Sequence, residues 1–194
     1  VPRHVASFGT VVVGLASMAS GVPLWLRIID PTRGPTSAVA GAVGVDGFSV
    51  FAYWVIAAAV VLVALLFHGY LAREGLEGVE PYALMMFSAA GAMVMASAND
   101  LVVLFIGLEI LSLAAYTLAA MHRRRIGSLE AGLKYFILGA AASAFLLYGI
   151  ALLYGATGTT SLGAMRTYLD GQGLVSDNLL LGGIAMVIIG LGFK

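Results

Sequence analysis

The chain has 194 residues, of which 61% are hydrophobic and only 10% are charged, and its mean hydropathy is +1.01. A soluble domain carries about 25% charged residues, so this composition excludes soluble, disordered and nucleic-acid-binding proteins. Ten basic residues balance ten acidic residues, so no net field attracts a polyanion. The sequence has no cysteine, which excludes disulfides and thiolate-ligated metal or iron–sulfur sites in this chain.

Apolar runs of the length needed to cross a bilayer, about 20 residues, recur along the chain. The predicted spans are Phe8–Leu26, Phe48–Leu71, Pro81–Ala98, Leu101–Met121, Ala131–Tyr154 and Leu179–Lys194, the last of them cut short. The connections are predicted to be loops from their turn residues, and the longest are Asp30–Gly47 and Gly155–Asn178. We therefore expect an all-α, polytopic transmembrane helical bundle in which residues 1–194 form a single domain. Because the chain begins with Val1 and its last apolar run is unfinished, we expect a fragment of a longer protein.

The distribution of basic residues predicts the orientation of the bundle. The loops alternate between two sides of the membrane, and one side collects Arg3, Arg73 and the cluster Arg123–Arg125. The other side has Arg27, Arg33 and Arg166. Cytoplasmic loops carry an excess of Lys and Arg. The side with the arginine cluster is therefore predicted to be cytoplasmic, and the Asn99–Asp100 turn to face outward.

Glu109 is the clearest ionisable residue within a predicted span. It lies about nine residues from the outer end of its helix, which is ~13 Å deep at ~1.5 Å per residue and close to the middle of a ~30 Å hydrocarbon core. A charge there costs about 2.5–3.5 kcal/mol on insertion scales and is functional by default. Ser112 and Tyr116 lie on the same helical face and are candidates to hydrogen-bond the carboxyl or a water beside it. The alternative is a protonated carboxyl that only joins two helices.

Two lysines also fall within predicted spans. Lys194 lies about fifteen residues into its run, and the Gly190–Gly192 segment before it suggests an irregular or broken helix, the device with which transporters place ion sites at the midplane. Alternatively, Lys194 ends the helix and snorkels to the inner surface. Lys134 lies about one turn from the inner end of its helix, where it either passes protons or pairs with Glu130 at the surface. Such buried ionisable groups suit proton movement.

The remaining polar features predict no binding site. His68 lies near an inner helix end and is interpreted as an interfacial residue, and three histidines without a carboxylate pattern do not favour a metal site. No glycine-rich phosphate loop follows a strand, so nucleotide binding is not predicted.

Longer stretches of the sequence resemble a known family. DLVVLFIGLEILSLAAYTLAA, followed by LEAGLKYFILGAAASAFLLYGIALLYGATGTTSL, closely resembles the antiporter-like subunit N family of NADH:quinone oxidoreductase, respiratory complex I. VDGFSVF at 45–51 and the closing GLGFK are similar too, so the resemblance extends from Val45 to Lys194.

The resemblance implies a fold of about fourteen helices with two inverted five-helix repeats, of which this chain would hold one half-channel without its last helices. It also implies that Glu109, Lys134 and Lys194 carry protons across the membrane. NAD, flavin, iron–sulfur clusters and quinone are then expected in other parts of the complex, and this chain is expected to bind no cofactor. The implied partners are other membrane-arm subunits, the lipid bilayer and protons. The implied location is the inner (plasma) membrane of the cell, which the chain crosses several times.

Two other functions fit the same residues. A subunit of a multi-subunit cation/proton antiporter shares the fold and would exchange sodium for protons without redox chemistry. An inert membrane scaffold would use its buried charges only to join helices.

Within the proton-transfer interpretation, Glu109 is expected to act as an electrostatic switch that controls whether Lys194 keeps its proton. If the two charges are assumed to lie ~7–10 Å apart, they attract each other by ~1.7–2.4 kcal/mol at an effective dielectric constant near 20.

Overall fold

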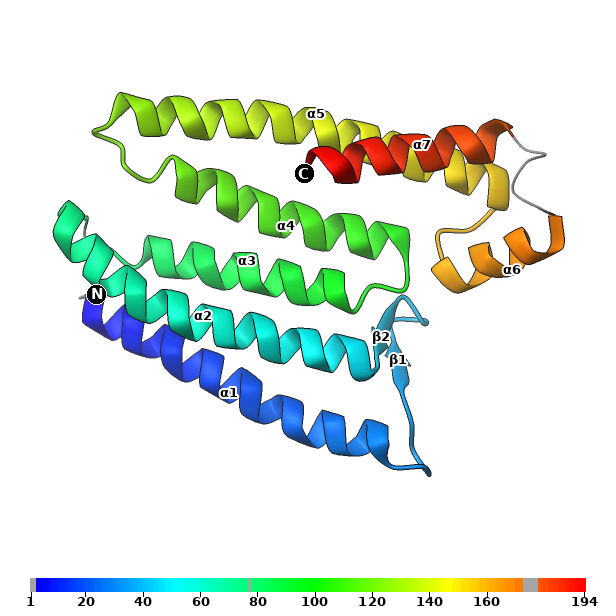
Figure 1. Cartoon of the computed structure of the whole chain (residues 1–194), viewed down its shortest axis with the longest axis horizontal. Coiled ribbons are helices and arrows are strands. Elements are labelled where there is room, and N and C mark those ends of the chain that lie inside the picture. The colour runs from blue at the N-terminus through cyan, green and yellow to red at the C-terminus, as the bar shows by residue number, and fades with distance from the viewer. Residues whose placement is uncertain (1–2, 77, 173–177) are drawn as a thin grey trace.

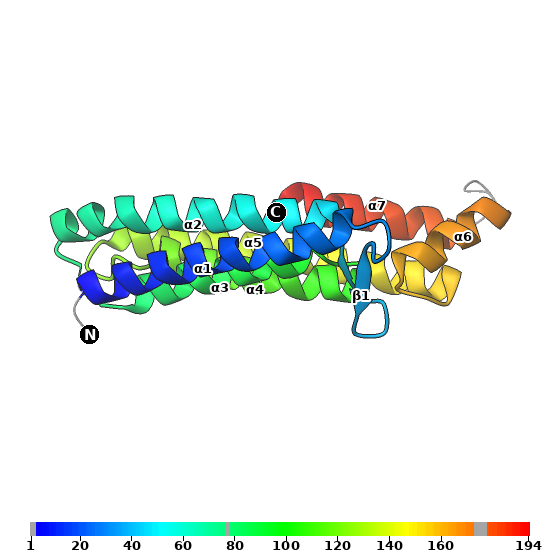
Figure 2. The ribbon, with the colours of Figure 1, turned by 90° about the horizontal axis from the view of Figure 1, so that it is seen from below.

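The computed structural model describes residues 3–76, 78–172 and 178–194. The elements within this part are α1 (Arg3–Ile29), β1 (Thr36–Ala38), β2 (Val43–Val45), α2 (Gly47–Glu74), α3 (Glu80–Ala96), α4 (Leu101–Ala119), α5 (Ile126–Thr157), α6 (Leu162–Gln172) and α7 (Asn178–Phe193). The helices α1 to α5 lie side by side in chain order and alternate in direction, and α7 packs against α5 (Figure 1). Seen after a 90° turn, the bundle is long and flat (Figure 2).

The lengths and surfaces of the helices agree with a membrane environment. Among the described residues, four helices are long and apolar enough to cross a membrane by length and composition: α1 from His4, α2, α4 and α5. Only 22–33% of the residues in their most apolar windows are buried within the chain. The exposed remainder includes large apolar side chains such as Phe8 and Leu66, which are 71% and 76% exposed. The prediction of an all-α, polytopic transmembrane bundle is confirmed.

Two predicted loops contain regular structure. Asp30–Gly47 holds the antiparallel hairpin β1–β2, and Gly155–Asn178 holds α6. Apolar side chains recur in α6 at helical spacing, because Leu162, Met165 and Leu169 occupy positions i, i+3 and i+7. Met165 is buried in the core formed by α4, α5 and α7, and Leu169 packs against that core. The prediction of loops was therefore wrong here, because α6 is stabilised by packing and the hairpin by backbone hydrogen bonds, and neither needs a long apolar run.

One end of the bundle, the hairpin end, is joined by backbone hydrogen bonds. The α3–α4 turn binds the hairpin through Gly44 N to Ser97 O at 2.7 Å and Asn99 N to Ala42 O at 2.9 Å. The same turn binds the start of α6 through Leu162 N to Asn99 O at 2.9 Å. This band holds the ends of several helices in a fixed relation.

The opposite end, the arginine end, carries the loop between α4 and α5. Arg125 Nη2 lies 2.7 Å from Glu74 Oε2 at the end of α2, and His122 Nε2 lies 3.4 Å from the same oxygen. Ser128 Oγ donates to Ala119 O at 2.7 Å and so ties α5 to the last turn of α4. Arg125 therefore also makes a structural ion pair, in addition to its contribution to orientation.

Glycines allow two pairs of helices to approach closely. A Cβ at Gly107 on α4 would lie 2.9 Å from Gly91 O on α3, and one at Gly149 on α5 would lie 2.7 Å from Val187 N on α7. A Cβ at Gly190 on α7 would lie 2.7 Å from Leu146 N on α5. Small residues at such contacts let helix backbones pack in membranes. The second pair of helices is the one that fixes the position of Lys194.

Candidate functional site

The helix α4 places Glu109 in the middle of the bundle. Asp100 caps the helix, because its Oδ1 accepts a hydrogen bond from Val102 N at 2.8 Å and its Oδ2 accepts one from the Thr160 hydroxyl at 2.5 Å. Glu109 is the ninth of the nineteen residues of α4, and its side chain is 26% exposed. An ionised carboxyl at this depth requires a partner.

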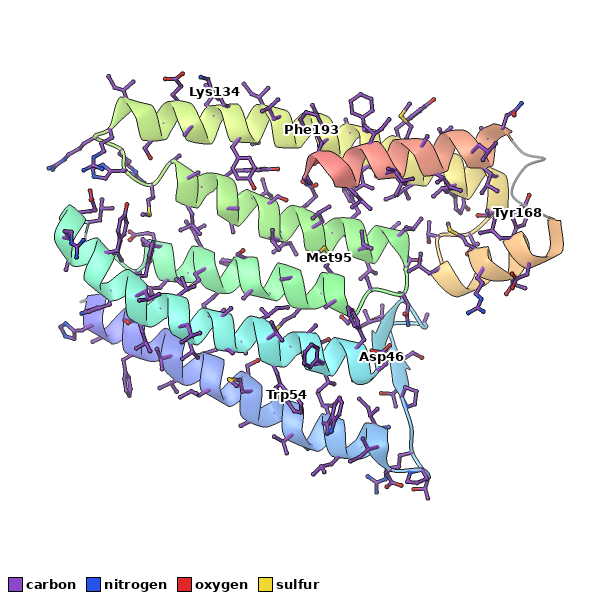
Figure 3. The ribbon with its side chains drawn as sticks, in the orientation of Figure 1. Asp46, Trp54, Met95, Lys134, Tyr168 and Phe193 are labelled. Carbon is purple, nitrogen blue, oxygen red and sulfur yellow. The ribbon has the colours of Figure 1, made fainter. Side chains whose placement is uncertain are left out.

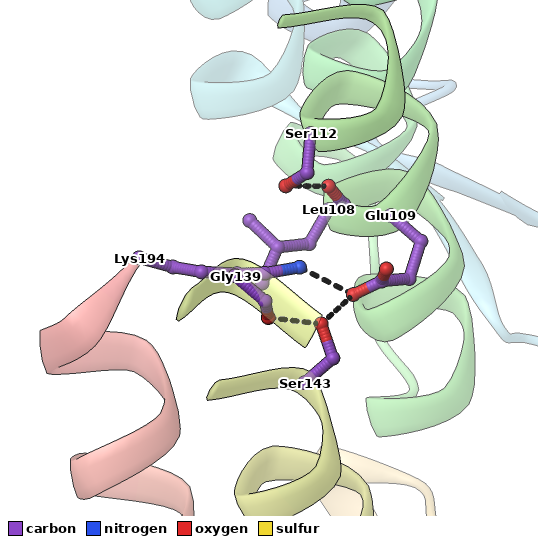
Figure 4. A network of polar contacts seen from close by, with 6 residues as sticks. All are labelled: Leu108, Glu109, Ser112, Gly139, Ser143 and Lys194. Carbon is purple, nitrogen blue, oxygen red and sulfur yellow. Dashed lines mark hydrogen bonds and ion pairs between the residues drawn. The ribbon is translucent and has the colours of Figure 1, made fainter. Parts of the chain in front are cut away.

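The partner is Lys194. Its ammonium nitrogen Nζ contacts Glu109 Oε1 directly, and its side chain is only 5% exposed (Figure 4). Both α4 and α7 run from the hairpin end towards the arginine end (Figure 1), which is the relation predicted for these two helices. The assumed separation of ~7–10 Å is wrong for this structure, because the two side chains are in contact.

The backbone before Lys194 is regular, contrary to the broken helix suggested by Gly190–Gly192. The helix α7 continues through these glycines to Phe193. A glycine is needed at position 190 because a Cβ there would collide with Leu146 on α5. The glycine therefore serves helix packing and does not break the helix. A regular helix that packs closely on α5 delivers the lysine to the middle of the bundle.

Ser143 of α5 is a third member of the site, and the sequence analysis missed it. Its hydroxyl Oγ lies 2.7 Å from Glu109 Oε1 and 2.8 Å from Gly139 O on its own helix (Figure 4). The site therefore joins α4, α5 and α7. The sequence does show Ser143 as a lone hydroxyl within the apolar run 140–146. Whether this hydroxyl faces Glu109, however, depends on how α5 packs against α4.

The two polar neighbours predicted on α4 make no direct hydrogen bond to Glu109, and their contact with a water beside it stays a prediction. The Ser112 hydroxyl donates to Leu108 O of its own helix at 2.6 Å. Tyr116 is 6% exposed, and its hydroxyl has no hydrogen-bond partner among the described residues. Its ring packs edge-on against Tyr135, with centroids 4.6 Å apart.

Lys134 lies apart from this pair. Its Nζ is 2.5 Å from Glu130 Oε1, and the two side chains are 69% and 58% exposed. It projects from the side of α5 that faces away from α4 (Figure 3). The preceding Gly132 lies against Ala120, so Lys134 is level with the last turn of α4. The geometry includes the Glu130 pair predicted by the surface interpretation, and the role of Lys134 stays a prediction.

The other polar candidate is at the arginine end. His68 Nδ1 is buried and has no hydrogen-bond partner in the described part of the chain. His68 and His4 line a shallow cavity of about 260 Å³ between α1 and α2. Among the described residues, no group of three or more His, Cys, Asp or Glu side chains is arranged to hold a metal ion.

The chain is similar to proteins of known families over its whole length. A family model described as NADH:quinone oxidoreductase/Mrp antiporter, transmembrane, matches residues 98–194. NADH-quinone oxidoreductase subunit N 2 of Roseiflexus castenholzii is 37% identical over 199 residues, covering 100% of this chain and 39% of that protein. Subunit N 1 of Sorangium cellulosum is 46% identical over 152 residues, covering 77% of this chain and 30% of that protein.

Solved structures share the fold. A chain of respiratory complex I from Thermus thermophilus with bound aureothin superposes with a TM-score of 0.77 at 32% identity, covering 99% of this chain and 39% of that chain. A chain of the Mrp complex from Dietzia sp. DQ12-45-1b superposes with a TM-score of 0.73 at 20% identity, covering 98% of this chain and 36% of that one. The second likeness concerns the fold alone.

This chain spans about two fifths of the length of the first of these relatives. The family model covers half of the chain and includes Glu109, Lys134 and Lys194. The chain therefore belongs to the NADH:quinone oxidoreductase/Mrp antiporter family of transmembrane proteins, and the resemblance to subunit N that was predicted from its sequence is confirmed.

Proposed function

We propose that this chain translocates protons as part of the membrane arm of an NADH:quinone oxidoreductase. The observation that carries the proposal is the direct ion pair of Glu109 and Lys194 within an apolar helical bundle. The relatives named above as subunit N of that enzyme support it. On this proposal the chain is a translocase subunit of the inner membrane, and its partners are other membrane-arm subunits.

The ion pair is suited to move a proton because its two members depend on each other. The Lys194 side chain is nearly inaccessible to solvent, and a buried ammonium is costly without a counter-charge. The carboxylate of Glu109 supplies that charge and so holds the proton on the lysine. When the pair opens, the lysine is left desolvated and alone, and it releases its proton.

Lys134 is proposed as the next proton carrier towards the arginine end. It lies nine residues before Ser143 on α5, which is ~13 Å along the helix axis. Its pair with Glu130 on the exposed side of α5 also fits a purely structural role. The family resemblance supports the carrier role.

Electron transfer is assigned to other subunits. The chain has no cysteine to ligate an iron–sulfur cluster, and the chemistry of its central site is that of charge and proton exchange. NAD, flavin, iron–sulfur clusters and quinone are accordingly proposed to bind elsewhere in the complex. The chain couples to their reactions through proton movement alone.

The proposal is tested with Glu109→Gln, Lys194→Met and the double variant in the complete complex, in membrane vesicles. Each single variant leaves one buried group without its partner, so we expect proton pumping to fall by about tenfold or more. The double variant removes both charges and is expected to assemble well yet pump no better than either single variant, because residues that act as a unit are not additive. Full pumping in the double variant refutes the proposal.

The cation/proton antiporter alternative would use the same ion pair. Its distinguishing property is sodium exchange without NADH oxidation. Vesicles that contain the complete complex are therefore compared with and without sodium. Pumping that follows NADH oxidation and is independent of sodium supports the oxidoreductase, and sodium-dependent proton exchange without NADH supports the antiporter.

A further inference from the structure

A cavity of about 540 Å³ lies between α6 and the hairpin-end portions of α5 and α7. Its floor includes Leu153, Met165 and Leu180, which are buried members of the apolar core at this end of the bundle. Arg166 and Asp170 of α6 form part of its rim, and their side chains are 86% and 76% exposed. Ligand pockets have volumes of about 300–1,000 Å³. The cavity is therefore large enough for a ligand, and it combines an apolar interior with a positive and a negative group at its mouth.

The position of the cavity along α7 sets its depth in the membrane. Glu109 lies near the middle of the hydrocarbon core, and Lys194 at the end of α7 contacts it. Ile184 and Leu180, which line the cavity, precede Lys194 by ten and fourteen residues, or ~15 and ~21 Å along the helix. The hydrocarbon core ends ~15 Å from its middle, and the headgroup layer extends ~5–7 Å further. The cavity therefore lies where the acyl chains of one leaflet meet their headgroups.

The helix α6 has the pattern of a helix that lies in the membrane interface, and it is found at the hairpin end of the bundle (Figure 1). Met165 and Leu169 pack into the core below it, whereas Arg166 and Asp170 are exposed. Helices with one apolar and one polar face lie in the plane of the interface. The backbone hydrogen bond from Leu162 N to the α3–α4 turn fixes the start of α6 to the bundle. The two rim charges are therefore held at headgroup level.

The two rim groups keep most of their hydrogen-bonding capacity. They lie one helical turn apart, and Arg166 Nε is 4.0 Å from Asp170 Oδ2, which is too long for a hydrogen bond. A guanidinium group forms strong, paired hydrogen bonds with phosphate oxygens. A carboxylate accepts hydrogen bonds from an ammonium group. The rim is therefore complementary to a ligand that carries a phosphate and an ammonium close together.

We propose that this cavity binds phosphatidylethanolamine, with an acyl chain in the apolar interior, the phosphate on Arg166 and the ammonium on Asp170. A two-carbon bridge joins the phosphate and the ammonium of this lipid, so binding at Arg166 brings the ammonium to the next turn of α6. Phosphatidylglycerol has no ammonium, and the quaternary ammonium of phosphatidylcholine has no N–H to donate. A free phosphate ion would leave the apolar interior unfilled. The site is independent of the proposed function, because it requires only that the bundle lies in a membrane.

The experiment uses the complete complex in vesicles that contain a trace of a lipid with a photoreactive acyl chain. Phosphatidylethanolamine, phosphatidylglycerol and phosphatidylcholine with the same chain are compared, and the label on residues 153–184 is measured after illumination. We expect phosphatidylethanolamine to label this segment most strongly. Arg166→Gln should lower that label by about fivefold, the effect of one arginine at the membrane surface. Arg33→Gln is the matched control, because Arg33 is also exposed and lies 3.8 Å from a carboxylate, that of Asp30, but does not line the cavity.

Each outcome supports or overturns the lipid site. A fall in the phosphatidylethanolamine label in Arg166→Gln but not in Arg33→Gln supports it. Equal labelling by the three lipids overturns it, because the segment would then contact only bulk lipid. Absence of label from all three also overturns it, because another segment or subunit would then cover the cavity. Asp170→Asn is expected to remove the preference for phosphatidylethanolamine over phosphatidylglycerol, and an unchanged preference contradicts the role of the carboxylate.

Discussion

A comparison of Glu109→Asp with Glu109→Gln separates a charge switch from a helix contact. Asp keeps the charge but shortens the side chain by one methylene. Gln keeps the size and the hydrogen-bonding capacity but removes the charge. A switch requires the charge, so we expect Asp to pump better than Gln. If Glu109 only joins helices, the order is reversed, because Gln fills the space between α4 and α5 and Asp does not.

The magnitudes can be worked from the contact between the two side chains. Opposite charges in contact, about 3 Å apart, attract each other by about 5.5 kcal/mol at an effective dielectric constant near 20, and at ~7–10 Å by about 1.7–2.4 kcal/mol. Opening the pair by that amount changes the attraction by about 3–4 kcal/mol. Moving one charge through 100 mV costs about 2.3 kcal/mol. One opening, which the coupled reaction must drive, therefore destabilises the protonated lysine by enough to release its proton against about 130–170 mV.

The same calculation ranks the variants. In Glu109→Asp the carboxylate lies ~1.5 Å further from the ammonium of Lys194. The charge–charge attraction between the two groups then falls to about two thirds of its original value. Gln keeps none of the charge–charge term, and it leaves the ammonium of Lys194, which is 5% exposed, without a counter-charge. We expect the Asp variant to retain a measurable part of the pumping rate and the Gln variant to lose most of it.

The assay is NADH-driven acidification of inverted membrane vesicles. NADH oxidation by an artificial electron acceptor, which bypasses proton movement, serves as the control for assembly. Both variants should oxidise NADH normally in that control. A Gln variant that pumps as well as the original protein, or better than the Asp variant, refutes the charge switch.

Other predictions concern the inner carrier, the orientation and the helix packing. We expect Lys134→Ala to lower pumping in an assembled complex, whereas loss of a surface pair alone would cost only a few tenths of a kcal/mol and leave the rate unchanged. A cysteine placed within 123–125 should react only with reagents on the cytoplasmic side, and one within 32–37 only from outside; the opposite pattern reverses the predicted orientation. Gly149→Val should lower the free energy of unfolding by about 1–3 kcal/mol, measured as a lower melting temperature of the complex, because its Cβ would lie 2.7 Å from Val187 N on α7. Gly192→Val is the matched control, because no atom lies within 4 Å of a Cβ there, and equal destabilisation would contradict the packing argument.

Features that depend on local apolar content were predictable from the sequence. Each predicted span corresponds to a helix, with ends that differ by a few residues, because a long apolar run has few alternatives to a helix in a membrane. The common depth of Glu109 and Lys194 and the common direction of their helices were also predictable, whereas the contact of the two side chains depends on packing. Both lie deep in their helices, and the alternation of the loops makes those helices run in the same direction, as the structure confirms.

Features that depend on packing were not predictable. The helix α6 is short, has apolar residues at helical spacing among polar ones and is stabilised by the burial of Met165 against neighbouring helices. The contact of Ser143 with Glu109 requires a particular rotation of α5 about its axis. The close contact of Gly190 with Leu146 appeared in the sequence as a possible helix break. In each case the deciding interaction joins residues that are distant in the sequence.

The packing of α7 on α5 also limits how the ion pair can open. Gly149 and Gly190 bring these two helices into close backbone contact, and packed interfaces of this kind resist gradual deformation. Gly190 precedes Lys194 by four residues, about one helical turn, so the lysine lies one turn from the close contact. The carboxyl of Glu109, whose side chain is 26% exposed, has more room to move than the side chain of Lys194, which is 5% exposed. Opening of a few ångströms is therefore expected to be local, by rotation of these side chains, while the α5–α7 contact stays intact.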